Sequence, residues 1–257
     1  MSGTSEKRNR TRMKLNDKAY LAIYEKEEDH WWFRGRRAVL TELLKVLDLP
    51  ARADILDVGC GTGGNLVFLK AYGNVDGCDY AEEALRYCAM RGFKHVRQAD
   101  ICDLPHADGS YDLVTCLDVI EHVRLDTVAF QELTRITRPG GYIIVTLPVN
   151  PRLYSSFDCL CGHLRRYTFE DMKVIAAAND LRLARISCYT SLAHPVVRYY
   201  MYRGDLEKGR GNLGRGMESG LPGSNALLTA LCRLEARLLR YVDLPWGSSL
   251  FAIFHKP

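Results

Sequence analysis

The sequence predicts an α/β fold in which helices cover both faces of a doubly wound, mostly parallel sheet. Three observations predict it. Short apolar segments alternate with amphipathic segments from residue 54 to residue 147, which is typical of βαβ units. A glycine-dense turn at 59–64 joins the first apolar segment to a helix-like segment. Acidic residues follow several predicted strands, at the sheet edge where ligands bind in such folds.

The composition fits one cytoplasmic domain with an elaboration. A chain of 257 residues can bury a sizeable core, and a formal charge of +4 does not imply a strong polyanion-binding surface. Nine scattered cysteines, an odd number, indicate free thiols in a reducing cytoplasm. We find no signal peptide and no apolar run near the ~20 residues that a spanning helix needs.

Two segments precede the core. Residues 1–14 are polar and basic, and we expect a mobile tail rather than a nucleic-acid arm. Residues 15–50 predict a helical lid across the mouth of the fold. It contains one helix from Asn16, a break at His30–Arg34, and a second helix from Gly35 that Pro50 ends.

The core elements follow in order. Apolar runs predict strands at 54–58, 74–79, 95–98, 112–117 and 141–147, and amphipathic segments predict helices at 64–72, 81–90 and 126–137. We assign residues 51–257 to the main domain, with its ligand edge at the carboxyl ends of the parallel strands.

The rest of the chain elaborates this domain. After a long connection at 148–168, we expect a helix at Phe169–Ala178, a strand at Leu183–Tyr189 and an antiparallel last strand at Ser249–His255. A C-terminal helical insert at 190–245 contains a flexible glycine-rich stretch at 203–223 and a helix from Ser224 to about Tyr241. Its leucine stripe predicts core or homodimer packing rather than a membrane-surface contact, because the polar face lacks a dense basic strip. The stripe comprises Leu227, Leu228, Leu231, Leu234, Leu238 and Leu239.

The glycine turn predicts a nucleotide-like cofactor. Gly59-x-Gly61-x-x-Gly64 fits a dinucleotide fingerprint, which makes the predicted fold Rossmann-like. The bare backbone of the turn lets a ligand approach the N–H groups at the start of the next helix. Asp57, two residues before the first glycine, would repel a pyrophosphate but attract an ammonium and a sulfonium. The sequence therefore favours S-adenosylmethionine over NAD.

Further acids complete the expected cofactor site. Asp79 ends the second strand, where a carboxylate accepts hydrogen bonds from ribose hydroxyls. We expect Asp100 to accept from the adenine amine while Ile101 packs on the ring. Asp118 ends the buried strand at 112–117. Each acid alone is typical of a turn, but their serial order after successive strands indicates one site.

Residues 54–148 resemble a class I S-adenosylmethionine-dependent methyltransferase. The resemblance rests on 55–63, Asp79, 99–105, 111–114, 118–123 and 138–141. Within this class the chain is similar to small-metabolite enzymes such as the ubiquinone-type O-methyltransferases. The flanks at 29–37 and 162–168 resemble bacterial members found beside sugar-modifying or natural-product enzymes. The resemblance covers 29–185 well and implies S-adenosyl-L-homocysteine as product. The expected cofactor residues are Trp32, Arg36, Asp57, Gly59, Cys60, Gly61, Asp79, Tyr80, Asp100, Ile101, Leu117, Asp118 and His122.

Two of these positions rest on separate reasoning. An aromatic ring in the run Trp31-Trp32-Phe33 would attract a sulfonium, with plain packing as the alternative. The resemblance implies that Arg36 or Arg37 pairs with the methionine carboxylate of the cofactor, and the sequence leaves the register between them open.

Acceptor chemistry has fewer signals. His122 and His163 are candidate general bases, which typically add ~10²–10⁴-fold to the rate. The alternative for His122 is a pocket wall, and for His163 a loop anchor paired with Asp158 or Glu170. Arg165, Arg166 and Tyr167 are candidate acceptor-binding residues, although the arginines could instead hold their loop to Asp171.

We expect no metal, because Cys159-x-Cys161-Gly162-His163 has no second ligand cluster at zinc-like spacing. The sequence thus predicts a metal-independent methyltransferase that modifies oxygen or nitrogen of a sugar-containing or secondary metabolite. An accessory protein that binds the cofactor without turnover, an RNA or protein methyltransferase, and an NAD-dependent oxidoreductase are the alternatives. Asp57 disfavours the last of these, and nucleic acid is not the expected partner.

Overall fold

The computed structural model describes residues 17–199 and 223–257. Its centre is one seven-stranded sheet with the order β3-β2-β1-β4-β5-β7-β6. The strands are β1 (Ala53–Val58), β2 (Gly73–Asp79), β3 (Arg97–Gln98), β4 (Tyr111–Leu117), β5 (Thr137–Pro148), β6 (Arg182–Tyr189) and β7 (Ser249–His255). Strands β1 to β5 pair in parallel, whereas β7 is antiparallel to both β5 and β6. The predicted fold class is confirmed.

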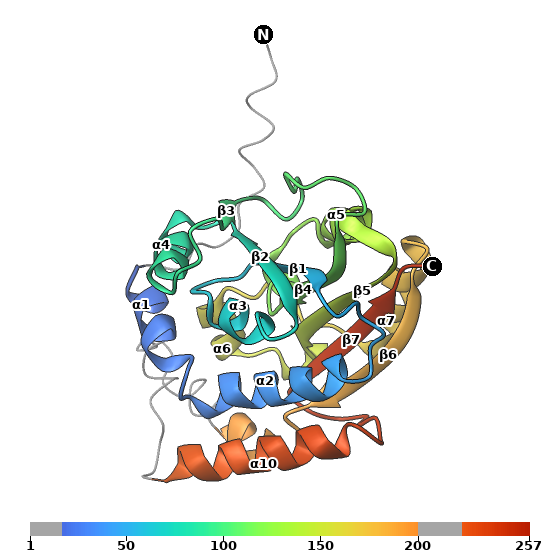
Figure 1. Ribbon diagram of the computed structural model, residues 1–257. Coiled ribbons are helices and arrows are strands. Elements are labelled where there is room, and N and C mark those ends of the chain that lie inside the picture. The colour runs from blue at the N-terminus through green and yellow to red at the C-terminus, as the bar shows by residue number, and fades with distance from the viewer. Residues whose placement is uncertain (1–16, 200–222) are drawn as a thin grey trace.

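Helices lie on both faces of this sheet (Figure 1). They are α1 (Asp17–Lys26), α2 (Trp31–Leu44), α3 (Gly64–Leu69), α4 (Glu82–Met90), α5 (Asp126–Ile136), α6 (Ser156–Cys161), α7 (Phe169–Ala178) and α10 (Ser224–Leu238), with short 3-10 turns η2 (Ile120–His122) and η3 (Pro151–Leu153). One core packs α5 and α7 side chains such as Phe130 and Met172 on the sheet. The other core packs α2 and α10 side chains such as Leu40 and Ala236 on the opposite face.

Helix α2 differs from the prediction. It begins at Trp31 rather than Gly35, so the predicted break falls before the aromatic run and not within it. Leu40 and Leu43 are buried against the sheet. The second N-terminal helix is therefore part of the core as well as a wall of the site described below.

Helix α10 lies beside α2 (Figure 1). The predicted leucine stripe does not form one buried face. Leu228 and Leu239 are buried, while Leu227, Leu234 and Leu238 are exposed. The expected basic tail and most of the glycine-rich stretch, residues 1–16 and 200–222, lie outside the described residues. Within the described ranges, no helix combines the length and apolar character needed to span a bilayer.

Candidate functional site

The glycine turn after β1 is the centre of the candidate site. Gly59, Gly61 and Gly63 have φ values of 75°, 55° and 87°, which L-residues with side chains rarely adopt. A Cβ at Gly59 would lie 2.5 Å from Cγ2 of Val119. A Cβ at Gly61 would meet no atom within 4 Å. Gly59 therefore permits close packing, and Gly61 keeps its backbone open to the adjoining space.

A pocket of about 260 Å³ lies against this turn, at the carboxyl edge of the sheet. The pocket draws on α2, the glycine turn and the ends of β2 and β4. Ten predicted cofactor residues line it: Trp32, Arg36, Gly59, Cys60, Gly61, Asp79, Tyr80, Leu117, Asp118 and His122. The predicted set thus converges on one cavity.

Asp79 forms part of the pocket wall next to the turn. One carboxylate oxygen accepts from the backbone N–H of Gly61 at 2.9 Å, and the other accepts from the N–H of Ala81 at 2.9 Å. These bonds fix the carboxylate at the edge of the sheet. Each oxygen has a second lone pair with which to accept another hydrogen bond.

Asp57 lies beneath the turn rather than in the pocket wall. Its Oδ1 accepts from the hydroxyl of Thr115 at 2.6 Å, and the residue is fully buried. Burial raises the pKa of Asp57 from 3.8 to about 6, although the Thr115 hydrogen bond and the charge of Arg36 act in the opposite direction. Asp57 can therefore act on a ligand through its charge, at a cost to the folded state.

Asp100 and Ile101 line a smaller hollow of about 20 Å³ instead of the main pocket. Tyr80 lines both spaces, so the two are neighbours. The Asp100 carboxylate accepts from the N–H of Cys102 at 2.9 Å, which orients it at the hollow. The adenine role predicted for this pair stays a prediction.

Arg36, not Arg37, enters the pocket. Its buried guanidinium forms an ion pair with Asp118, whose φ of 56° lies in the left-handed region. The Trp32 ring centroid is 4.8 Å from the Arg36 guanidinium carbon. Arg37 points elsewhere and donates to the carbonyl of Glu27 at 2.6 Å. Of the two arginines that the sequence left open, Arg36 is therefore the one that lines the pocket, and its pairing with the methionine carboxylate stays a prediction.

Glu27 is a buried residue of this site that the sequence analysis missed. It accepts from the Thr62 hydroxyl at 2.5 Å and pairs with Arg91 at 2.8 Å. Burial raises its pKa despite these partners. Glu27 ties the segment before α2 to the glycine turn. The sequence around Glu27 carries no signal for this role; the structure explains Gly64, 37 positions away, because any Cβ there would collide with the Glu27 carboxylate.

Glu121, His122 and His163 come together at one end of the pocket. One ligand-type atom of each lies within 4.8 Å of the others, and the two imidazole centroids are 5.0 Å apart. Nδ1 of His122 lies 3.0 Å from the Gly162 carbonyl, and Nδ1 of His163 lies 2.7 Å from Oδ1 of Asp158. Because these oxygens accept, each Nδ1 carries a proton, and in a neutral imidazole Nε2 then carries the lone pair.

This cluster is a ligand set that suits a divalent metal ion. The prediction of no metal rested on sequence spacing: the Cys-x-Cys-Gly-His run has no second ligand cluster, and Asn179-Asp180 lies too far along the chain to serve a catechol-type metal site. The fold instead combines Glu121 and His122 with a histidine 41 residues away. Cys161 lines the pocket nearby, whereas Cys159 is exposed.

The predicted acceptor-binding residues hold their own loop. Arg166 is buried and makes two hydrogen bonds to Asp158, at 2.8 and 2.9 Å. Arg165 pairs with Asp126 at 2.7 Å, and the Tyr167 hydroxyl donates to the same carboxylate at 2.9 Å. None of the three lines the pocket.

The geometry therefore matches the loop-holding alternative, with different acids from the one predicted. Asp171 instead caps α7 through Thr168. Burial alone would raise the pKa of Asp158, but hydrogen bonds from His163 and Arg166 hold it below its ordinary value. Asp158 is thus the ionised acceptor that orients His163, and the predicted pairing of His163 with Asp158 is the one found, rather than that with Glu170.

Comparison with known proteins shows which protein family this chain resembles. Residues 56–145 match the methyltransferase domain family. A protein from Mycolicibacterium smegmatis, named a probable S-adenosylmethionine-dependent methyltransferase, is 32% identical over 123 residues, 47% of each chain. This chain thus spans about half the length of that relative. A ubiquinone biosynthesis O-methyltransferase from Thiobacillus denitrificans is 27% identical over 190 residues, 66% of this chain and 82% of that protein.

A solved structure shares the fold. Geranyl diphosphate C-methyltransferase from Streptomyces coelicolor, crystallised with Mg²⁺, geranyl-S-thiolodiphosphate and S-adenosyl-L-homocysteine, superposes with a TM-score of 0.56. The alignment covers 85% of this chain and 75% of that one, at 17% identity. The matched domain thus shows that residues 56–145 form a methyltransferase domain of the class I S-adenosylmethionine-dependent type, and the solved structure shares its fold.

Proposed function

We propose that this methyltransferase modifies an oxygen or nitrogen of a small-molecule acceptor that binds beside His122. One observation carries the proposal. His122 lines the cofactor pocket and at the same time faces His163 and Glu121, so acid–base or metal-ligating groups stand at the end of the donor site. A sugar-containing or secondary metabolite is the acceptor class that we favour.

The residues of the pocket fit the cofactor. Asp79 is placed to accept from the ribose hydroxyls, and a Cβ at Gly61 would project into the space that the donor needs. Arg36 is the partner that we assign to the methionine carboxylate. S-adenosylmethionine supplies an electrophilic methyl group, so the protein has to align the two reactants and exclude water.

The histidine cluster has the chemistry to activate a hydroxyl. Asp158 orients His163 through Nδ1, as the carboxylate of a catalytic triad orients its histidine, which leaves Nε2 as the proton-accepting atom. A divalent ion held by Glu121, His122 and His163 would polarise the same hydroxyl as a Lewis acid. Both roles need His163, and only the second needs a metal.

Labelled methyl donor and cell extract test the function directly. We expect the label in the low-mass fraction after the extract is separated into small molecules, RNA and protein. Label in RNA or protein would refute a small-molecule acceptor. Cofactor binding by calorimetry without transfer to any fraction would indicate the accessory role.

Variants of His163 test the chemistry. His163→Ala should lose transfer by about 10²-fold or more while keeping its cofactor affinity, because His163 does not line the donor pocket. The exposed His95→Ala is the matched control and should behave as wild type. Elemental analysis of purified protein, and activity after chelation and readdition of metal, then separate the metal from the base: wild-type activity in metal-free protein assigns His163 as base.

A further inference from the structure

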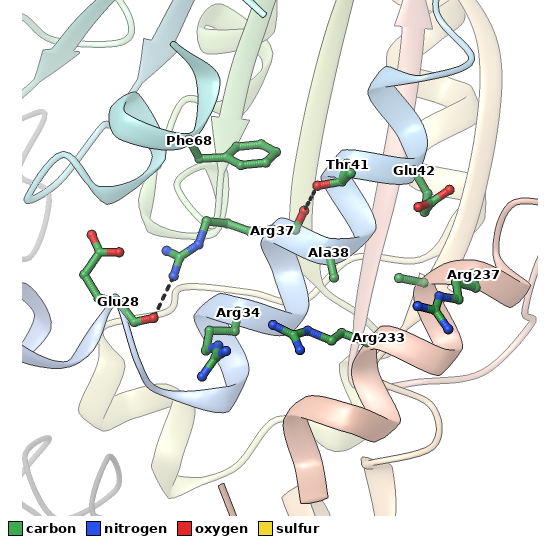
Figure 2. A pocket seen from close by; sticks show the side chains of 10 residues that line it. Glu28, Arg34, Arg37, Ala38, Thr41, Glu42, Phe68, Arg233 and Arg237 are labelled. Atoms are coloured by element: carbon green, nitrogen blue, oxygen red, sulfur yellow. Dashed lines mark hydrogen bonds between the residues drawn. The ribbon is translucent and has the colours of Figure 1, made fainter. Parts of the chain in front are cut away.

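A second pocket lies between α2 and α10, away from the cofactor site. Four arginines line this groove of about 370 Å³: Arg34 and Arg37 from α2, and Arg233 and Arg237 from α10. Figure 2 shows the four side chains extending from the two neighbouring helices. Arg36 points to another side of α2, into the cofactor pocket. The methyl-transfer site therefore does not account for this groove.

The groove carries an excess of positive charge. Two glutamates at its edge are engaged by other cations: Glu42 pairs with Lys45 at 2.7 Å, and Glu28 pairs with Arg91 at 2.9 Å. The Arg37 side chain donates to the backbone carbonyls of Glu27 and Glu28, and the dashed line in Figure 2 marks the bond to Glu28. Across residues 17–199 and 223–257, no carboxylate lies within 4.0 Å of the four guanidinium groups.

An apolar row runs along α10 next to these arginines. Leu227, Leu234 and Leu238 are 63%, 50% and 45% exposed, and their spacing of seven and four residues places them on one side of the helix. Tyr241, three residues after the end of α10, continues the row and is 80% exposed. Trp246, beyond the helix, is 53% exposed. Arg233 and Arg237 each precede a leucine of the row by one position. The basic and apolar rows thus lie side by side on the solvent-facing part of α10.

We propose that this α2–α10 surface, defined by Arg34, Arg37, Arg233, Arg237 and the exposed row Leu227, Leu234, Leu238 and Tyr241, binds the surface of an anionic membrane. Adjacent basic and apolar rows match lipid headgroups and the outer part of the acyl chains. A dense basic strip is absent from α10 alone, which is why the sequence argued against such a contact. The fold completes the strip with two arginines from α2.

Charge and polarity disfavour the other occupants. A second copy of the chain seated on this face would bring two like-charged arginine groups together. A nucleic acid would engage the arginines but would leave four large apolar side chains without a partner. An anionic bilayer uses both rows at once.

Vesicle sedimentation of the full chain tests the proposal. Wild type should bind vesicles of equal parts phosphatidylcholine and phosphatidylglycerol, bind pure phosphatidylcholine much more weakly, and lose affinity as salt rises. The double variant Arg233→Gln, Arg237→Gln should bind about thirtyfold more weakly, since each basic residue near an anionic surface contributes a factor of about five. Arg86→Gln, an exposed arginine on α4, is the charge control and should leave binding unchanged.

The apolar row gives the decisive second variant. Leu234→Ser with Leu238→Ser should weaken binding by about tenfold or more, since both side chains leave the bilayer boundary, whereas the exposed Val174→Ser on α7 should not. Cofactor affinity that stays at the wild-type value shows that each variant is folded. Equal binding to neutral and anionic vesicles, or no effect of the leucine variant, would overturn the membrane contact. A wild-type dimer that only the leucine variant dissociates would assign the face to a second copy instead.

Discussion

Replacing Asp57 by Asn should stabilise the cofactor-free protein and weaken its binding of S-adenosylmethionine. Asp57 is fully buried, and burial raises its pKa from 3.8 to about 6. A pKa that is raised in the folded state means that ionisation opposes folding. The penalty is absent below the ordinary pKa, grows between pH 3.8 and about 6, and is complete above that range.

The size of this effect follows from the shift. About two pKa units correspond to ~3 kcal/mol between the two protonation states. Asn keeps an oxygen for the Thr115 hydroxyl but carries no charge. At neutral pH the variant should therefore gain up to ~3 kcal/mol, or roughly 6–12 °C in melting temperature for a chain of this size. Near pH 4 the two proteins should melt at similar temperatures.

Thermal melts without cofactor, from pH 4.5 to 8, measure this difference. Asp54→Asn on the same strand is the control with the opposite sign, because hydrogen bonds from Asn74 and Arg138 lower the pKa of Asp54. That carboxylate stabilises the fold above its ordinary pKa, and the stabilisation is lost as the pH falls. A difference between wild type and Asp57→Asn that does not change with pH would refute the reasoning.

The affinity for S-adenosylmethionine should fall in the Asp57→Asn variant, whereas its stability should rise. The ammonium and sulfonium of S-adenosylmethionine favour the ionised form of Asp57, so wild-type affinity should fall as the pH drops below about 6. Calorimetry on Asp57→Asn should show weaker binding with little pH dependence in this range. Stability gained at the expense of ligand affinity is the usual sign of a functional buried charge.

Three further outcomes can be checked. Asp79→Asn should lower the affinity for S-adenosylmethionine by about 1–3 kcal/mol in calorimetry, whereas the exposed Asp76→Asn on the same strand should not. Arg166→Met should lower the free energy of unfolding by about 3–5 kcal/mol in urea titrations, because it leaves Asp158 buried without its guanidinium partner; a raised KM at unchanged stability would instead assign Arg166 to the acceptor. Gly61→Ala should cost about 1–2 kcal/mol of stability from the left-handed backbone and a larger loss of cofactor affinity, since its Cβ would enter the pocket.

Elements whose pattern is local could be predicted from the sequence. The predicted ranges Phe169–Ala178 and Ser249–His255 coincide with α7 and β7. A capping box with Thr168 and Asp171 starts α7, and the five central residues of β7, 250–254, are apolar because both faces of the strand are buried. Such signals lie within a few residues of the element that they specify.

The start of α2 combines a local cap with a distant one, and His30 gives the local cap by accepting from the N–H of Trp32 at 3.3 Å. The sequence predicts a break at His30–Arg34, where three aromatic residues have lower helix propensity than most of the residues that follow. The structure begins the helix at Trp31, whose backbone N–H donates to the Asn225 side chain at 2.7 Å. The same side chain donates to the carbonyl of Asp29 at 2.9 Å. A cap supplied by a residue 194 positions away is invisible to any local pattern.

The residues of the candidate site likewise fall into those that the sequence could predict and those that it could not. Cofactor residues that follow consecutive strands were predicted because the fold class alone brings strand ends together, and most of them line one pocket. The Glu121–His122–His163 cluster was missed as a metal ligand set because its geometry depends on a loop. Asp158 and Gly162 orient the two imidazoles, and Arg166 holds Asp158 in place. The residue types alone indicated general bases and residues that bind the methyl acceptor. They did not indicate how these side chains are arranged, because the arrangement depends on the loop.

The register of α2 connects both proposed surfaces. Successive residues of a helix point about 100° apart, so a shift of one residue would replace Arg36 by Arg37 in the cofactor pocket and remove an arginine from the groove beside α10. The burial of Leu40 and Leu43 against the sheet and the cap that Asn225 of α10 gives to Trp31 both agree with the observed register. In this register Arg36 reaches Asp118. A movement of α2 would therefore act on both surfaces, because this helix supplies Arg36 to the cofactor pocket and Arg34 and Arg37 to the groove.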